Sequence, residues 1–140
     1  MNEITYKQAG TIPYKIVSDE LYFLIITSRK KKNWIFPKGL IENDLSETET
    51  AIKETYEEAG VKGKIDQNPV GIYQNKKWNG TCIIKLFAYC IQEELPTWPE
   101  GSFRHRKWVK ANKIKEFLDD SQIIKLAEKA EKILKTKLCD

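Results

Sequence analysis

Three glutamates that could bind a metal ion lie within five residues of one another, at Glu54, Glu57 and Glu58. On a helix, which advances ~100° per residue, their side chains share one face about 100° wide. Like charges three or four residues apart destabilise a helix by roughly 0.2–0.5 kcal/mol per pair, so the cluster favours a bound cation. Carboxylate oxygens are the ligands that Mg2+ and Mn2+ prefer. On this cluster alone, an exposed acidic helix without a ligand is an equally good interpretation.

Histidine and cysteine, the usual zinc ligands, are scarce in this chain. The sequence contains one histidine and three cysteines, and no two cysteines form a Cys-x-x-Cys pair. The usual spacings of a zinc site are therefore absent. An oxygen-liganded ion, Mg2+ or alternatively Mn2+, is the metal that the sequence favours.

Clusters of cations precede and follow the acids. Residues 29–32 read Arg-Lys-Lys-Lys, Lys38 comes next, and further basic groups occur at 76–77 and 104–107. Each cluster by itself is typical of a solvated loop. Cations beside a carboxylate-bound metal are nevertheless the arrangement that binds a polyphosphate, because metal and side chains together neutralise its charge. The combination predicts an anionic, phosphate-containing ligand.

A helix at residues 46–59 must position the acids. Ser46 and Glu49 form the Ser-x-x-Glu pattern of a capping box, and Gly60 can end the helix in the left-handed conformation. The helical wheel adds Glu47 to the acidic face of the three clustered glutamates. A separate stripe is predicted to lie on a sheet: Thr48, Ile52, Thr55, Tyr56 and Ala59.

The remaining segments are mainly strand-like. The hydrophobic pattern predicts strands at 4–17, 21–27, 69–74, 81–92 and 107–109, and helical segments at 111–118 and 121–137. An apolar stripe follows the last helix at Ile123, Ala127, Ala130, Leu134 and Leu138. Hairpin-length connections between neighbouring strands favour an α/β fold in which helices cover both faces of a mixed sheet.

Length and composition indicate one ordinary domain, residues 1–140. With 41% hydrophobic and 31% charged residues, the chain is neither a disordered tail nor a collagen-like repeat. Its net charge of +4 suits an anionic substrate without requiring nucleic acid. Because no apolar run could span a membrane and the first residues do not read as a signal peptide, we expect a cytoplasmic protein with no membrane partner. Monomer and homodimer are both compatible with the sequence.

The stretch 39–61, GLIENDLSETETAIKETYEEAGV, resembles the Nudix box, Gly-x5-Glu-x7-Arg-Glu-U-x-Glu-Glu-x-Gly-U, where U is a bulky apolar residue. The matching positions are Gly39, Glu54, Glu57, Glu58, Gly60 and Val61, and the departures are Leu45, Lys53 and Thr55. Further similarity, at 34–39, 57–63, 70–75, 104–109 and Trp98, is greatest to the diadenosine polyphosphate and diphosphoinositol polyphosphate phosphohydrolases. The resemblance implies a Nudix-type α/β/α sandwich and Mg2+-dependent hydrolysis of a diphosphate linked to a second group.

The resemblance also implies roles for the matched residues. Glu54 and Glu58 would be the main metal ligands, together with the carbonyl of Gly39. Glu57 would be a further ligand or the base that activates water, so that Glu54 and Glu57 are the expected catalytic residues. A late acid often completes the metal shell in relatives, and Glu100 is the candidate here. The alternative for Glu100 is an ordinary solvent-exposed loop residue.

Substrate contacts are expected from cations and aromatic rings outside the acidic helix. The expected phosphate contacts are Arg29, Lys38, Arg104 and Arg106. Adenine could stack on Tyr73, Trp78 or Trp98, whose alternative role is ordinary half-buried packing.

The three departures from the Nudix box differ in their expected consequences. Lys53 keeps the charge of the family's Arg but lacks its planar fork of donors, so we expect reduced rather than abolished activity. Leu45 replaces a carboxylate that is chiefly supportive in relatives. Thr55 faces the core stripe and can stand in for a small apolar residue.

The sequence thus predicts a hydrolase that cleaves a pyrophosphate bond, with a diadenosine polyphosphate as the favoured substrate. Inositol pyrophosphates, RNA 5′ ends and inorganic polyphosphate are the alternative substrates, which the basic loops support. An alternative of a different class is a catalytically silent Nudix domain that binds a nucleotide or RNA, suggested by Leu45 and Lys53.

Overall fold

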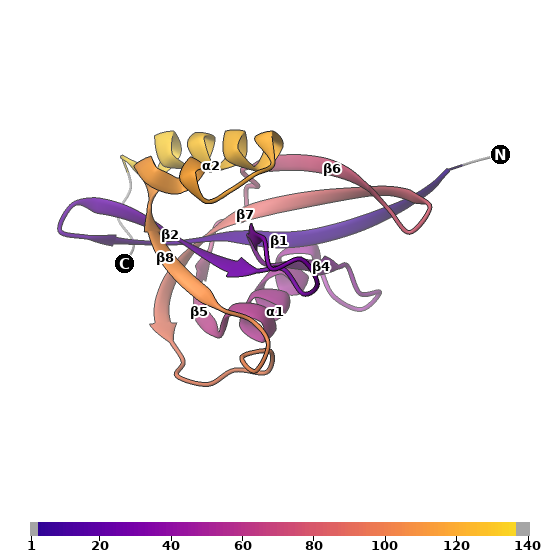
Figure 1. Cartoon of the computed structure of the whole chain (residues 1–140), viewed down its shortest axis with the longest axis horizontal. Helices are drawn as coiled ribbons and strands as arrows, with labels where there is room; N and C mark the ends of the chain where they lie inside the picture. The colour runs from indigo at the N-terminus through magenta and orange to yellow at the C-terminus, as the bar shows by residue number, and fades with distance from the viewer. Residues whose placement is uncertain (1–2, 137–140) are drawn as a thin grey trace.

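A computed structural model gives the fold of residues 3–136 (Figure 1). The strands are β1 (Ile4–Val17), β2 (Glu20–Thr27), β3 (Trp34–Ile35), β4 (Lys38–Leu40), β5 (Val61–Ile65), β6 (Gly71–Lys77), β7 (Gly80–Glu94) and β8 (Arg106–Lys110). The helices are α1 (Glu47–Ala59), the short 3-10 helix η1 (Ala111–Glu116) and α2 (Ser121–Leu134).

Two long strands, β1 and β7, form the centre of the sheet. They pair in parallel from Ile4 opposite Gly80 to Tyr14 opposite Cys90. The other pairings are antiparallel: β2 and β4 with β1, β5 and β6 with β7, and β3 and β8 with β2. The predicted mixed sheet is therefore confirmed.

Helices cover both faces of this sheet. In Figure 1, α2 lies above the strands and α1 below them. The side chains of β2 alternate between the two helical layers. Phe23 and Ile25 belong to the buried cluster that includes α2, whereas Leu24 and Ile26 pack with Ala59 of α1. A strand buried on both faces explains the continuous apolar run at 21–27. The expected α/β/α sandwich is confirmed.

Helix α1 begins and ends as the sequence predicts. The Ser46 hydroxyl accepts a hydrogen bond from the Glu49 amide at 3.1 Å, and the Glu49 carboxylate accepts one from the Ser46 amide at 2.8 Å. Gly60 ends the helix with φ 69° in the left-handed region. The buried face differs from the predicted stripe, however, because it includes Glu58, while Tyr56 is 37% exposed.

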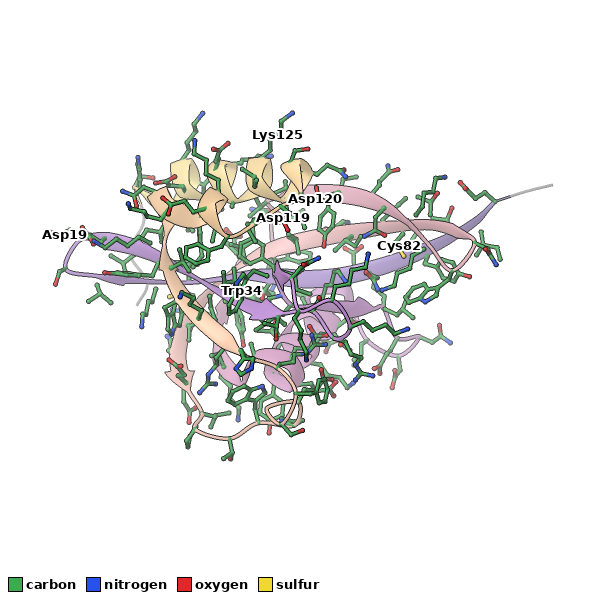
Figure 2. The ribbon with its side chains drawn as sticks, viewed as in Figure 1. Asp19, Trp34, Cys82, Asp119, Asp120 and Lys125 are labelled. Atoms are coloured by element: carbon green, nitrogen blue, oxygen red, sulfur yellow. The ribbon has the colours of Figure 1, made fainter. Side chains whose placement is uncertain are left out.

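Other departures from the predicted elements are local. The strands β3, β4 and β5 were not predicted. Residues 111–116 form a 3-10 helix. Helix α2 ends at Leu134, and Leu138 of the predicted stripe lies outside the described residues. Figure 2 shows Lys125 projecting away from the sheet on the outer face of α2.

A helix that spans a membrane is long and predominantly apolar, and the helices within residues 3–136 are neither. None of them has the length and apolar character needed to cross a bilayer.

Candidate active site

A cavity of about 330 Å³ brings together residues that are far apart in the sequence. Its lining includes eight of the predicted site residues: Arg29, Lys38, Gly39, Glu54, Glu58, Trp78, Glu100 and Arg104. Five further residues complete it: Gln8, Ser28, Ile35, Leu40 and Lys77. Acids from α1, cations from several strands and loops, and one exposed aromatic ring therefore share a single space.

Glu58 is the most deeply buried acid of this cavity, with 6% of its surface exposed. Its Oε1 accepts a hydrogen bond from the backbone amide of Lys38 at 3.2 Å, and its Oε2 lies 3.9 Å from Arg104 Nη2. Burial raises the pKa of Glu58 to about 8, and the neighbouring Glu54 charge adds to this, against the opposing influence of Arg104. Glu58 therefore holds a proton more readily than an ordinary carboxyl.

Glu54 lies one helical turn before Glu58 and directly against Gly39. A Cβ atom at Gly39 would overlap the Glu54 carboxylate, so a larger residue at this position would displace that side chain. Burial raises the pKa of Glu54, and the charge of Glu57 raises it further. Two desolvated carboxylates beside an accessible backbone form a donor set that suits a hard cation.

Glu57 points to a different side of α1, where Lys53 holds it. The Lys53 ammonium lies 3.0 Å from the Glu57 carboxylate and 2.8 Å from that of Glu42. Glu57 does not line the cavity. As predicted, the lysine retains the charge of the family's arginine, and it divides that charge between two acids.

Glu100 is held by two arginines. Its carboxylate accepts a hydrogen bond from Arg104 Nε at 2.7 Å and lies 3.9 Å from Arg29 Nη2. Arg104 is 9% exposed and also donates to the carbonyl of Thr27 at 2.8 Å. Arg104 thus links Glu100 to Glu58 and is committed to contacts within the protein, while the Arg29 side chain is 65% exposed.

The acids form a pair rather than a complete metal cage. Within residues 3–136, no group of three or more His, Cys, Asp or Glu side chains has the arrangement of a metal site. Glu54 and Glu58 fit a divalent cation because burial penalises two adjacent negative charges that a cation would neutralise. The two nearest further carboxylates are both in ion pairs, Glu57 with Lys53 and Glu100 with Arg104.

The cavity contains three further cations. Lys38 is half-buried, and burial lowers its pKa, with a further contribution from the nearby charge of Lys77. Lys77 and Arg29 are exposed. Together they supply positive charge to the space that Glu54 and Glu58 also line.

Trp78 is the predicted base-stacking residue that the structure brings to this cavity. The residue is 46% exposed, with Lys77 Nζ 4.5 Å from the ring centroid and Tyr6 in edge-to-face contact at 5.2 Å. Tyr73 is only 3% exposed and lies in the core beneath α2, so it has no surface for a base.

Arg106 and Trp98 do not line the cavity. The Arg106 guanidinium lies 3.9 Å from the centroid of the Trp98 ring and donates to backbone carbonyls at the end of α1. The expectations of phosphate contact for Arg106 and of base stacking for Trp98 therefore find no support in the geometry. Both side chains are engaged in the protein's own packing.

Of the five lining residues that were not predicted as site residues, three are polar. Lys77 belongs to a basic pair that the sequence reveals, but only the β6–β7 turn places it at the cavity. Gln8 is a buried polar residue of β1, 5% exposed, which is the kind of signal that could have identified it. Ser28 follows β2 and carries no distinguishing pattern.

The departures from the Nudix box are accommodated locally. Thr55 is fully buried against the sheet, and its hydroxyl shares a 2.7 Å hydrogen bond with that of Thr11. Leu45 is half-buried in the loop before α1. The expectation that Thr55 faces the core is confirmed.

A second cavity of about 400 Å³ lies between the β1–β2 hairpin, η1 and α2. Asp19 at the tip of that hairpin marks this end of the molecule in Figure 2. Two of its cations are paired with acids of the same lining, Lys110 with Glu20 at 3.1 Å and Lys135 with Glu131 at 4.0 Å. It shares no residue with the acidic cavity.

Comparison with known proteins gives consistent matches. The NUDIX domain family matches residues 15–134. Nudix hydrolase 13, mitochondrial, of Arabidopsis thaliana is 34% identical over 133 residues, which cover 79% of this chain and 64% of that protein. Diphosphoinositol polyphosphate phosphohydrolase 2 of Mus musculus is 29% identical over 106 residues, covering 74% and 58%. The chain thus spans about three fifths of the length of these curated relatives.

Solved structures share the fold at lower sequence identity. The structure of an Ap4A hydrolase from C. elegans superposes with a TM-score of 0.73 at 19% identity, covering 94% of this chain and 99% of that chain. The likeness concerns the arrangement of strands and helices.

Proposed function

Because the chain belongs to the NUDIX domain family, we propose that it is a divalent-metal-dependent hydrolase that cleaves a pyrophosphate bond in a nucleoside-diphosphate-linked or polyphosphorylated compound. The observation that carries this proposal is a pair of neighbouring carboxylates, the half-buried Glu54 and the buried Glu58, in a cavity that is also lined by Arg29, Lys38 and Lys77. Acids to hold a metal and bases to hold phosphates are what such a reaction needs.

The metal in this proposal is Mg2+, with Mn2+ as the alternative. Glu54 and Glu58 would hold it with the carbonyl of Gly39, and Glu57 or Glu100 would join after leaving its present partner. When bound, the ion would polarise phosphoryl oxygens and supply an activated water.

The protein's own groups would bind the phosphates and accept the proton. Lys38, Lys77 and Arg29 would neutralise phosphate oxygens, because they are the cavity cations not locked into buried ion pairs. Glu57, once released from Lys53, would accept the proton of the attacking water at its carboxylate. Arg104 would keep Glu58 and Glu100 in place rather than contact substrate.

A diadenosine polyphosphate is the substrate we favour. Trp78 offers an exposed ring at the cavity lining for one adenine, and the adjacent Lys77 would meet the phosphates that follow. An inositol pyrophosphate is the second candidate, because the name of the mouse relative refers to such compounds and the same cations would bind them. An RNA 5′ end also carries a base that could stack on Trp78, whereas inorganic polyphosphate would use the cations alone.

One assay separates these substrates. The protein is incubated with Mg2+ and a panel of diadenosine tetraphosphate, an inositol pyrophosphate, 5′-triphosphorylated RNA and inorganic polyphosphate, and the products are identified by chromatography. We expect the highest kcat/KM for diadenosine tetraphosphate, and a loss of this preference in Trp78→Ala. Fastest turnover of the inositol compound, unchanged in Trp78→Ala, would overturn the substrate assignment.

A catalytically silent Nudix domain is the alternative of a different class. The observation that favours it is the double ion pair of Lys53, which holds Glu57 away from the cavity. Tight Mg2+-dependent binding of a nucleotide without any product would support this alternative. Multiple turnover on any member of the panel would exclude it.

A further inference from the structure

The last turn of α1 is joined to one other segment, residues 95–106. The final four carbonyls of a helix lack partners within the helix itself. In α1 these are the carbonyls of residues 57–60, and each accepts a hydrogen bond from the same segment. The donors are the Glu100 amide to Glu57 (3.0 Å), the Trp98 indole to Glu58 (3.0 Å), Arg106 Nη1 to Ala59 (2.9 Å) and the Leu95 amide to Gly60 (2.9 Å).

Trp98 and Arg106 close this junction around Gly60. The guanidinium of Arg106 lies 3.9 Å from the centroid of the Trp98 ring, and Nη2 donates to the Leu95 carbonyl at 2.6 Å. A Cβ atom at Gly60 would come within 2.7 Å of Trp98 and 2.8 Å of Arg106. Together with its φ of +69°, this contact restricts the position to glycine.

The junction also compensates an unfavourable charge distribution. Glu57 and Glu58 lie at the C-terminal end of α1, where the helix dipole is negative, and α1 has no basic residue in its last turn. Arg104 and Arg106 bring positive charge to this end from outside the helix.

Glu58 is consequently fixed at two points by a single segment. Trp98 holds its backbone carbonyl, while Arg104 lies beside its carboxylate. The same segment carries Glu100 to the cavity, with its amide on the Glu57 carbonyl. Movement of residues 95–106 would therefore shift three acids together.

We propose that Trp98 and Arg106 are positioning residues, which hold the last turn of α1 so that Glu57, Glu58 and Glu100 keep one fixed arrangement. The catalytic consequence rests on the proposed function, whereas the structural consequence does not. Trp98 acts through its indole N–H and Arg106 through its fork of donors to backbone carbonyls, without either touching the substrate.

The variant Trp98→Phe tests this role, because phenylalanine keeps a ring against Gly60 and Arg106 but lacks the donor to Glu58. Trp108→Phe is the matched control. Trp108 also has a cation over its ring, Lys15 at 4.1 Å, and its indole also makes one hydrogen bond at 2.9 Å. The acceptor is the Glu94 carboxylate, which pairs with Arg106 Nε at 3.3 Å, so the Trp108 indole is connected to the junction only indirectly and donates no hydrogen bond to α1.

Two measurements on the full chain read out the effect. Backbone amide exchange of residues 55–60 should be about threefold to tenfold faster in Trp98→Phe, the size expected for one lost hydrogen bond, and less than about twofold faster in Trp108→Phe. Mg2+ affinity measured by calorimetry should fall by a similar factor in Trp98→Phe but not in Trp108→Phe. On a hydrolysed substrate, kcat should fall while KM changes less than twofold.

Arg106→Lys provides a second variant, since lysine keeps the charge near Glu94 but cannot reach the several carbonyls at once. It should give the same pattern as Trp98→Phe. Equal exchange and equal Mg2+ affinity in Trp98→Phe, Arg106→Lys and Trp108→Phe would overturn the positioning role. If the parent protein hydrolyses nothing on the panel, the proposed function fails, and the exchange measurement still decides the positioning role.

Discussion

The two helices that cover opposite faces of the sheet bury very different side chains. The buried residues of α2 are all apolar: Ile123, Leu126, Ala127, Ala130 and Leu134. Those of α1 are small or polar, and one is ionisable: Thr50, Ala51, Thr55, Glu58 and Ala59. Helix α2 therefore stabilises the fold by burying apolar side chains. Helix α1 buries fewer apolar side chains and instead brings carboxylates to the cavity.

In the part of the chain that the structure describes, two of the polar side chains that α1 buries have polar partners, and one does not. Thr55 shares a hydrogen bond with Thr11, and Glu58 accepts one from the Lys38 amide and lies beside Arg104. Among the described residues, Thr50 Oγ1 is a buried side-chain atom without a hydrogen-bond partner. A helix selected only for stability would have an apolar stripe at these positions, so the comparison separates a functional layer from a structural one.

Replacing the buried carboxyl group of Glu58 should have the largest effect on activity. It should not lower the free energy of unfolding. For Glu58→Gln we expect hydrolysis to fall at least about 1,000-fold, or ~4 kcal/mol of transition-state stabilisation. The free energy of unfolding without metal should not fall at pH 8, because the amide carries no charge to bury. Steady-state kinetics and urea unfolding measure the two. A variant that unfolds more easily but retains its rate would contradict the division between the helices.

Shortening the stripe of α2 should do the opposite. Leu134 is 2% exposed, and Leu134→Ala should lower the free energy of unfolding by about 2–4 kcal/mol through lost contacts and a cavity. At a temperature where the variant remains folded, kcat and KM should match those of the parent. Urea denaturation monitored by tryptophan fluorescence checks the first value. A comparable loss of kcat would show that α2 also positions the site.

The sequence predicts the structural layer well because its signals are local. The capping box at Ser46 and the glycine at Gly60 fix both ends of α1, and the period of the apolar residues defines the buried stripe of α2. Strand β5 escapes prediction because Val-Lys-Gly-Lys-Ile is short, half charged and interrupted by Gly63, whose close approach to the Cys90 carbonyl is a tertiary contact.

The site residues around α1 are predicted only in part. The sequence shows which side chains are charged, but it does not show which groups they contact. Glu54 and Glu58 follow from the helical spacing and meet in one cavity. Arg104, Arg106 and Trp98 read equally well as ligand contacts until long-range folding directs them to Glu58, to the end of α1 and to each other. Tyr56 and Glu58 exchange their expected environments because the wheel cannot place the sheet relative to the acidic face.

The pH dependence of stability provides an intermediate effect. Burial raises the pKa of Glu58 from 4.5 to about 8, so the folded protein binds this proton more tightly than the unfolded chain. Without metal, stability should fall as the pH rises from 4.5 towards 8. Because Mg2+ favours the ionised carboxylates, it should raise the Tm more at pH 8 than at pH 6, by about 2–4 °C. Thermal scans at both pH values measure this difference.

The control for that difference is Glu58→Gln, which has no proton to release at this position. Its Tm should respond to Mg2+ to a similar, small extent at both pH values. A larger stabilisation of the parent protein at pH 6 than at pH 8 would contradict the assignment of the raised pKa to the metal-binding pair.

The smallest effect concerns Lys53, the residue that holds Glu57. In Lys53→Arg the planar guanidinium should orient the neighbouring glutamates with paired hydrogen bonds, and kcat should rise about twofold to fivefold. The unfolding free energy should remain within about 0.5 kcal/mol, as expected for an exposed ion pair. Initial rates at saturating substrate decide the matter, and a decrease in kcat would mean that the lysine is itself adapted to this site.

The most direct measurement is the binding of Mn2+, followed by electron paramagnetic resonance, to the parent protein and to two variants of α1. Glu58→Gln removes a carboxylate from the cavity, and Glu47→Gln removes one that lies on the same helix but pairs with Lys85 at 3.0 Å outside the cavity. If Glu54 and Glu58 together hold the ion, Glu47→Gln should bind like the parent and Glu58→Gln should bind at least about tenfold more weakly. Equal affinity of all three proteins would contradict the account.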